Sequence, residues 1–313
     1  MIVTVTLNAA LEVAYEAGQV SWESANEVSR ARYRAGGRGI AVARVLHIFG
    51  HEVLAAGLAG GGTGELIRED LARSGIACDF TAMGRESRRI ITIAEEKGAS
   101  EEGTVKREWG GGRGVAGAGR TLRFREPGAY VTTEELGRFA ADYRRLLADA
   151  TAVVLCGSLP AGLPPEMYGS LATYAAEAGV PVILDAGGEE LLHGARRRPD
   201  LVIPDARAAG DRTSDAALIG FGVGAVARQA DGLVRVVTSA GGWSAFVQDG
   251  GAGEPGSRGG LVAGLVPGLL LGWSWPDRLR HALALAASAG PSGEVDLLSY
   301  ERLLDKVQID VPQ

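Results

Sequence analysis

Apolar and polar residues follow two different periods along the first quarter of the chain. Residues 1–7 alternate and are rich in β-branched types, so we predict a strand there. Apolar residues recur at helical spacing over 38–49, directly after two glycines, which predicts a helix. A strand over 52–57 and a helix over 63–74 follow, with Thr63 as the candidate N-cap of that helix.

From residue 133 onward, amphipathic stretches alternate with short runs that are apolar throughout. Such runs are typical of strands buried on both faces, in a parallel sheet covered by helices. This pattern predicts an α/β fold. The predicted helices are 133–148, 165–178, 214–230, 258–272, 276–289 and 298–305, and the predicted strands are 152–156, 181–185, 201–204 and 234–238.

A glycine-rich segment separates two further predicted strands, 89–95 and 121–126. Residues 98–119 contain too many glycines for a packed helix or strand, so we expect a loop or an insertion. Two hypotheses stay open for this segment: a disordered surface loop, or a lid or partner-binding flap. Trp109 in its middle favours the flap slightly.

Composition excludes several classes of protein. A length of 313 residues, of which 46% are hydrophobic, suits one large α/β domain. The net charge of −6 argues against a nucleic-acid or anionic-membrane partner. No apolar run reaches the roughly 18 residues of a membrane span. The two cysteines, Cys78 and Cys156, lack metal-ligand spacing, so we expect no metal site at them and a reducing, cytoplasmic compartment.

Glycine-containing turns recur where predicted strands end or helices begin. Gly36-Gly37-Arg38-Gly39 precedes a helix, Cys156-Gly157-Ser158 and Asp185-Ala186-Gly187 end buried strands, and Ser239–Ser244 follows another strand. Ligands of open α/β sheets bind at the carboxyl ends of strands, but each turn could also be an ordinary one. Asp185 could hold a metal-bound water or cap a helix. The turn Gly256-Ser257-Arg258-Gly259-Gly260 opens a helix and is a candidate anion hole.

Several short motifs follow one another in a characteristic order. They are Thr4-Val5-Thr6-Leu7-Asn8, residues 34–40, Glu126-Pro127-Gly128, Gly157-Ser158-Leu159-Pro160 and residues 184–188. These motifs resemble the TLNPALD, AGGKGIN, NEPG, GSLP and LDTSG elements of the ribokinase/PfkB sugar kinases, in the branch of 1-phosphofructokinase and tagatose-6-phosphate kinase.

The resemblance implies a single ribokinase-like domain over 1–313, in which a Rossmann-like sheet is covered by helices on both faces. It also implies a small β-sheet lid formed by about 9–35 and 86–130, through which such proteins often form homodimers. The implied substrate is a phosphorylated sugar or cyclitol, and ATP and Mg²⁺ are the implied cofactors of an active member. The implied substrate-binding residues are Asn8, Glu12, Gly36, Gly37, Arg38, Gly39 and Arg88, and the implied nucleotide-binding residues are Asp205, Ser239, Gly241 and Gly242.

The chain departs from the family where the chemistry is carried out. The catalytic aspartate of the family aligns with Gly259, just after the candidate anion-hole residues Gly256, Ser257 and Arg258. In the element tied to magnesium and phosphate, the family asparagine and glutamate align with Asp205 and Ala208. General-base assistance contributes about 10²–10⁴-fold to a rate, and glycine cannot supply it.

The sequence therefore supports three hypotheses about function. The first is a homologue that binds a sugar or cyclitol phosphate and whose phosphoryl transfer is lost or severely weakened. The second is a pseudokinase that acts as a sugar-phosphate sensor or as a partner subunit. The third is an active kinase of an unusual substrate, in which Asp205, Asp249 or Glu254 replaces the lost base.

Overall fold

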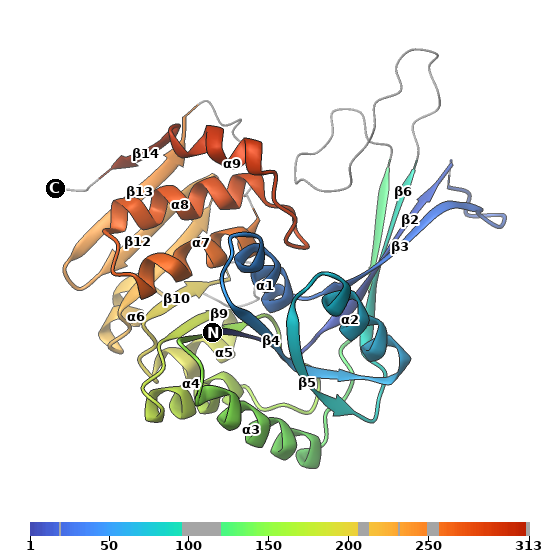
Figure 1. Ribbon diagram of the computed structural model, residues 1–313, viewed down its shortest axis with the longest axis horizontal. Coiled ribbons are helices and arrows are strands. Elements are labelled where there is room, and N and C mark those ends of the chain that lie inside the picture. Colours follow the sequence, from blue (N-terminus) through green and yellow to red (C-terminus); the bar gives the residue numbers. More distant parts are fainter. Residues whose placement is uncertain (19, 96–119, 206–212, 231, 249–256, 311–313) are drawn as a thin grey trace.

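One large sheet forms the centre of the molecule (Figure 1). The structure is a computed structural model that describes residues 1–18, 20–95, 120–205, 213–230, 232–248 and 257–310. The strands of the sheet are β1 Ile2–Thr6, β4 Val53–Gly60, β5 Ala77–Met83, β8 Ala152–Cys156, β9 Val182–Ala186, β10 Leu201–Pro204, β11 Ala225–Ala230, β12 Leu233–Thr238, β13 Gly241–Val247 and β14 Val307–Asp310. They lie in the order β14-β13-β12-β11-β10-β9-β8-β1-β4-β5.

The sheet is parallel from β5 to β11 and antiparallel beyond it. β1 pairs in parallel with both β4 and β8, and the same direction continues through β9 and β10 to β11. The last three strands pair as an antiparallel series, from β11 through β12 and β13 to β14. The carboxyl ends of the parallel strands therefore meet at one edge of the sheet.

Helices cover both faces of the large sheet, which confirms the predicted fold class. Alternate residues of β8 enter two different cores: Val154 packs with α1, α2, α7 and α8, whereas Leu155 packs with α3, α4, α5 and α6. This alternation follows from the two-residue period of a strand. The helices are α1 Arg38–Ile48, α2 Gly61–Arg73, α3 Thr133–Leu147, α4 Met167–Glu177, α5 Gly188–Ala195, α6 Asp215–Gly220, α7 Arg258–Leu270, α8 Trp275–Ser288 and α9 Leu297–Leu304.

A smaller second sheet stands beside α1 and α2 and projects away from the large one (Figure 1). Its strands are β2 Ala10–Ala17, β3 Val28–Gly36, β6 Arg88–Glu95 and β7 Thr121–Arg125, in the order β3-β2-β6-β7. β2 pairs antiparallel with β3 and parallel with β6, and β6 pairs antiparallel with β7. This sheet confirms the smaller β-sheet of the predicted fold class. The glycine-rich segment 98–119 lies outside the described residues.

The predicted helix over 214–230 is wrong beyond its first two turns. Helix α6 ends at Gly220, and β11 begins at Ala225. Gly222 adopts a positive φ of 91°, a conformation that a helix does not contain. An added Cβ at Gly224 would lie 2.5 Å from the carbonyl oxygen of Asp200, so the chain passes too close to its neighbour there for a larger residue. These glycines end the helix and start a buried strand.

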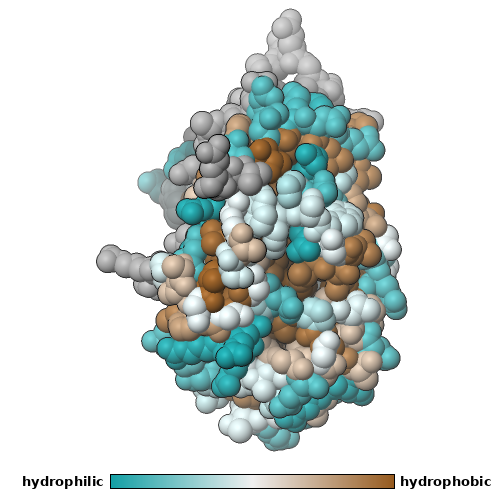
Figure 2. All heavy atoms as spheres, turned by 90° about the vertical axis from the view of Figure 1, so that its left-hand side faces the viewer, coloured by the Kyte–Doolittle hydropathy of each residue, from teal (hydrophilic) through white to brown (hydrophobic). Residues whose placement is uncertain are grey.

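The surface of the molecule is chemically mixed. The face drawn in Figure 2 shows hydrophobic residues in several patches between hydrophilic ones. Across the residues that the structure describes, no helix is both long enough and apolar enough to span a membrane.

Candidate functional site

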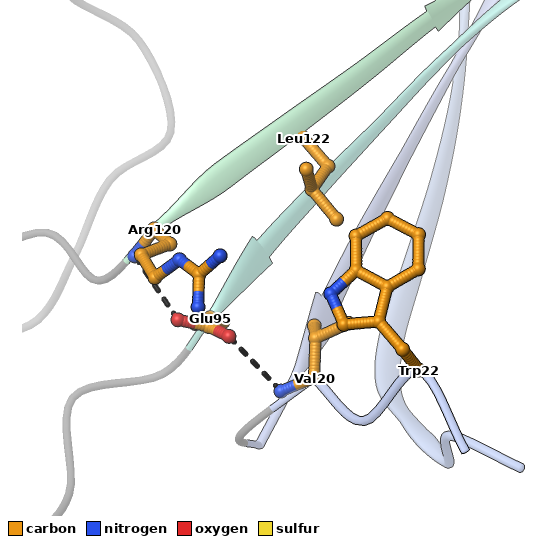
Figure 3. A pocket seen from close by; sticks show the side chains of 5 residues that line it. All are labelled: Val20, Trp22, Glu95, Arg120 and Leu122. Atoms are coloured by element: carbon orange, nitrogen blue, oxygen red, sulfur yellow. Dashed lines mark hydrogen bonds between the residues drawn. The ribbon is translucent and has the colours of Figure 1, made fainter. Parts of the chain in front are cut away.

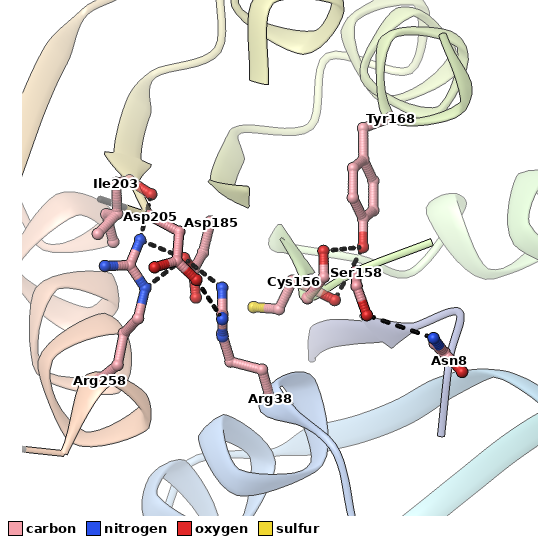
Figure 4. Close-up of polar contacts among 10 residues, drawn as sticks. Asn8, Arg38, Cys156, Ser158, Tyr168, Asp185, Ile203, Asp205 and Arg258 are labelled. Atoms are coloured by element: carbon pink, nitrogen blue, oxygen red, sulfur yellow. Dashed lines mark hydrogen bonds and ion pairs between the residues drawn. The ribbon is translucent and has the colours of Figure 1, made fainter. Parts of the chain in front are cut away.

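Charged residues gather at the edge of the sheet where β8, β9 and β10 end. Asp185 belongs to the end of β9, and Asp205 follows β10 directly. Arg38 and Arg258 are the first residues of α1 and α7. Figure 4 shows the two guanidinium groups approaching the two carboxylates from different sides. We call Arg38, Asp185, Asp205 and Arg258 the strand-end cluster.

One oxygen atom, Asp185 Oδ1, lies at the centre of the strand-end cluster. Arg258 contacts it through Nη2 at 2.6 Å and Nε at 2.7 Å, and Arg38 contacts it through Nη1 at 3.0 Å. Arg38 also donates through Nη2 to Asp205 Oδ2 at 2.6 Å. The guanidinium of Arg258 donates in addition to the carbonyl of Ile203 at 2.6 Å. Both arginine side chains are therefore held on carboxylate or carbonyl groups of the protein itself.

The ion pairs of the strand-end cluster are largely buried, which fixes the positions of their side chains. The Asp185 side chain is 0% exposed, and its Oδ2 atom has no hydrogen-bond partner among the residues that the structure describes. A buried carboxylate needs compensating charge, which the two guanidinium groups supply. Burial alone would lower the pKa of Arg38, but the adjacent carboxylates of Asp185 and Asp205 outweigh it and raise that pKa. The helix-capping role considered for Asp185 is wrong, because the N-cap of α5 is Gly187 and no side chain caps this helix.

Helix α7 begins with a side-chain cap and no acidic residue in its first turn. The Ser257 hydroxyl oxygen accepts from the Gly260 N–H at 3.3 Å and donates to the Gly290 carbonyl at 2.9 Å. Gly259 is buried, and an added Cβ would lie 3.2 Å from the Cβ of Ala41. Position 259 thus has little room for a side chain, and glycine supplies no group that could accept a proton. Gly256 lies outside the described residues.

The glycines around Arg38 are explained by packing of α1 against β1. Gly37 has a positive φ of 127°, and a Cβ there would lie 2.6 Å from the Thr6 side chain. A Cβ at Gly39 would lie 2.4 Å from Thr6 Oγ1. These close approaches bring the first turn of α1 against the end of β1, which positions Arg38 over the strand-end cluster.

The other expected substrate residues lie where the second sheet joins the large one. Asn8 donates through Nδ2 to Ser158 Oγ at 3.3 Å, and its carbonyl accepts from Arg88 Nε at 3.3 Å. Glu12 accepts a hydrogen bond from Ser292, and an added Cβ at Gly36 would clash with the Glu12 side chain. The structure therefore links Asn8 with Arg88 and Glu12 with Gly36. Sequence analysis missed Ser292, which no motif singled out.

A cavity of about 400 Å³ opens beside Arg88. It is also lined by Glu86, whose carboxylate accepts from the N–H groups of Gly62 and Thr63 at the start of α2. These hydrogen bonds lower the pKa of Glu86 below its ordinary value. The predicted N-cap at Thr63 is wrong, because the helix begins two residues earlier and a distant carboxylate satisfies its N–H groups.

The structure separates two parts of the expected nucleotide site. Gly241 and Gly242 lie in β13, in the hairpin that joins β12 to β13 across Ser239. Thr238, at the end of β12, pairs with Ala225 at the start of β11. Because β12 runs antiparallel to β11, Ser239 lies at the edge of the sheet opposite to Asp205. Asp205 and the turn with Ser239, Gly241 and Gly242 therefore do not form one site as expected. The end of β11, instead of the end of β12, lies at the same edge of the sheet as Asp205.

Part of the chain is similar to one family of known proteins. The pfkB family carbohydrate kinase model matches residues 9–106. A tagatose-6-phosphate kinase of Staphylococcus epidermidis is 30% identical over 191 residues, which cover 61% of this chain and 54% of that protein. The match therefore spans about half the length of the curated relative.

Solved structures match the whole fold. A possible 1-phosphofructokinase of Thermotoga maritima has a TM-score of 0.80 at 22% identity, over 100% of this chain and 99% of the other. Phosphofructokinase-2 of Escherichia coli in complex with fructose-6-phosphate has a TM-score of 0.79 at 20% identity, over 97% and 98%. At these identities the likeness establishes a shared fold.

Proposed function

We propose that this chain, which is similar to pfkB family carbohydrate kinases, binds a phosphorylated sugar or cyclitol without efficient phosphoryl transfer. On the expected substrate side, Arg88 donates to the carbonyl of Asn8, whose side chain donates to Ser158. Glu12 accepts a hydrogen bond from Ser292. We propose that the second sheet, with about residues 9–35 and 86–130, acts as a lid over this ligand. A cytoplasmic location belongs to the same proposal and rests on the two free cysteines.

The observation that carries the proposal is the start of α7. Phosphoryl transfer depends on charge neutralisation and on positioning, with a residue that takes the hydroxyl proton. Here that position is Gly259, and the preceding Arg258 is paired with Asp185 instead of facing an open anion hole. Because the carboxylate of Asp185 compensates the positive charge of Arg258, this guanidinium attracts a transferred phosphate only weakly.

Magnesium does not fit the carboxylates of the strand-end cluster. Mg²⁺ binds through carboxylates and phosphates, and it keeps several waters. Asp185 and Asp205 both lie on guanidinium groups, and Arg258 crowds the same oxygen of Asp185 that Arg38 contacts. Within the described ranges, no group of three or more His, Cys, Asp or Glu side chains could hold a metal ion. We therefore assign no step to ATP or Mg²⁺, which stay the cofactors of an active member.

A second candidate is the active kinase with a substitute base. Of the carboxylates considered for that role, Asp205 is paired with Arg38, while Asp249 and Glu254 lie outside the described residues. The variant Gly259→Asp separates the hypotheses, with Gly259→Asn as the control that has the same size and no carboxylate. Turnover of ATP by the native protein would identify an active kinase. Turnover confined to Gly259→Asp would identify a kinase that has lost only its base.

Calorimetric titration with tagatose 6-phosphate, fructose 6-phosphate and fructose 1-phosphate tests the binding proposal. We expect at least one of these to bind, and Arg88→Ala to weaken it at least tenfold, because a charged hydrogen bond to phosphate is lost. The control Arg73→Ala removes the same charge from an exposed position of α2. Binding that is unaffected by Arg88→Ala would contradict the proposed site.

We also propose that the protein forms a homodimer through the second sheet. Tyr33, Val13, Ile91 and Phe124 pair side by side across its four strands, and so share one face. Tyr33 is 52% exposed and Phe124 is 49% exposed. Figure 3 shows Trp22 beside Leu122 at the far end of this sheet. Val13, between Tyr33 and Phe124 in this row, is 3% exposed and belongs to the core, so the exposed part of the row is its two aromatic ends. Exposed aromatic side chains of this kind suit a second copy of the chain.

A further inference from the structure

The opposite face of the second sheet carries a concentration of arginines. The residues Arg34, Glu12, Ile90 and Arg125 pair in one row across β3, β2, β6 and β7. The next row, two residues further along each strand, is Arg32, Ala14, Thr92 and Arg123. Since residues two apart in a strand share a face, both rows lie on the same side of the sheet. We call this the arginine face.

The arginine face is strongly positive. It carries two glutamates, Glu12 and Glu16, both on β2. Arg32 contacts Glu16 at 3.6 Å, and Arg34 is paired with Glu294 of the loop before α9. The exposed side chains of Arg123 and Arg125 lie on β7, at the edge of the sheet. The arginines of this face are Arg30, Arg32, Arg34, Arg88, Arg123 and Arg125.

This face turns toward the side of the molecule where α7 begins. Glu12 accepts a hydrogen bond from Ser292, and Arg34 pairs with Glu294, so the face meets the loop between α8 and α9. The carbonyl of Gly290 in that same loop accepts from Ser257, the N-cap of α7. One loop therefore joins the arginine face to the start of α7. The arginines lie on the substrate side, and the apolar row with Tyr33 lies on the other.

Two arginines of this face are close enough to repel each other. Arg125 pairs with Ile90, two residues from Arg88 on β6, so the two side chains are diagonal neighbours on one face. Burial, followed by the positive charge of Arg125, lowers the pKa of Arg88, and Glu12 opposes this only in part. Neighbouring like charges destabilise a sheet. An anion bound between the two guanidinium groups would relieve that repulsion.

We propose that the arginine face binds a second anionic group of the ligand, so that the preferred ligand is a sugar or cyclitol with two phosphate groups. Arg88 and Arg125 take one phosphate, and Arg123 takes the second. The rows that carry Arg125 and Arg123 are separated by about 7 Å along the strand, a distance that one small phosphorylated ring can span. This inference rests on the proposed function and narrows its ligand class.

The test compares ligands with one and two phosphates by calorimetry. The probes are fructose 6-phosphate against fructose 1,6-bisphosphate, and inorganic phosphate against pyrophosphate. We expect the native protein to bind the two-phosphate member of each pair at least tenfold more tightly. Arg123→Ala should abolish most of that advantage while leaving the affinity for one phosphate within about twofold. Arg125→Ala should weaken both, because Arg125 shares the first phosphate with Arg88.

Controls separate this site from general charge attraction. Arg73→Ala, which removes one exposed positive charge from α2, should keep the full advantage of two phosphates. Arg123→Lys should keep part of it, because lysine is a point charge without the two-pronged geometry of arginine. An advantage that survives in Arg123→Ala, or that falls equally in Arg73→Ala, overturns the inference. If no sugar phosphate binds to the native protein, the proposed function fails, and the pyrophosphate comparison still decides whether the arginine face is an anion site.

Discussion

The guanidinium of Arg258 holds a buried carboxylate at the position where the start of α7 faces the strand ends. A buried charge left without any partner costs about 3–5 kcal/mol. In Arg258→Ala the carboxylate of Asp185 keeps Arg38 at 3.0 Å, so we expect this variant to lower the free energy of unfolding by less than that amount, as measured by urea denaturation. In the double variant Arg258→Ala/Asp185→Asn, the loss should be smaller than the sum of the single losses by more than about 1 kcal/mol. Additive losses would show that the pair does not interact.

For single residues, the sequence predicted which residues belong to the site better than it predicted which residues they contact. The motif order placed Gly259 at the position of the missing base, and it drew attention to Arg38 and Arg258. It did not show that both arginines share one oxygen of Asp185, because Arg258 and Asp185 are 73 positions apart in the chain. Such a contact depends on how α7 packs beside β9, which no local pattern encodes. The arginine face was missed for the same reason, since the pairing of strands creates it.

At the scale of elements, strand direction was the property that sequence patterns could not supply. The apolar run at 234–238 was predicted correctly as a strand, but its antiparallel pairing moves the following turn to the opposite edge of the sheet. The helix predicted over 214–230 failed because three glycines close together outweigh the apolar periodicity. Elements with regular periods and clear ends, such as α1, α3 and β8, were predicted well.

The packing of α8 on α9 predicts a dependence of stability on pH. His281 of α8 lies 2.7 Å from the Tyr300 hydroxyl of α9, and the Phe49 ring lies against it. Burial, together with the charge of His51, lowers the pKa of His281 to about 4 from an ordinary value of 6.5. The unfolded chain therefore takes up the proton first. Stability is complete above about pH 6.5 and is lost as the pH falls toward 4, by up to about 2 kcal/mol at pH 5.

Unfolding by urea at pH 7 and pH 5 measures this effect. We expect His281→Phe to reduce the difference in unfolding free energy between the two pH values, although His51 keeps part of it. The matched control is His47→Gln, which removes an exposed imidazole from the last turn of α1. An undiminished pH difference in His281→Phe would show that the imidazole is not shielded from water by the two helices.

For the whole molecule, the second sheet presents two chemically different faces, and each predicts its own interaction. The apolar face predicts self-association, which light scattering combined with size-exclusion chromatography measures directly. We expect the native chain to elute as a dimer, and Phe124→Asp or Tyr33→Asp to shift it to the monomer. Leu298→Asp on α9 introduces the same charge at another exposed apolar position, 74% exposed, and should leave the dimer intact. A monomeric native protein would contradict the proposed dimer.

We propose above that the strand-end cluster blocks phosphoryl transfer while the sugar-phosphate side stays open. Calorimetric titration of ATP with Mg²⁺ into the protein saturated with its tightest-binding sugar phosphate tests this most directly. We expect no heat of ATP binding, although the same preparation binds the sugar phosphate. Micromolar binding of ATP would contradict this expectation, because the nucleotide phosphates would then have access to the region that Arg38, Asp185 and Arg258 occupy together.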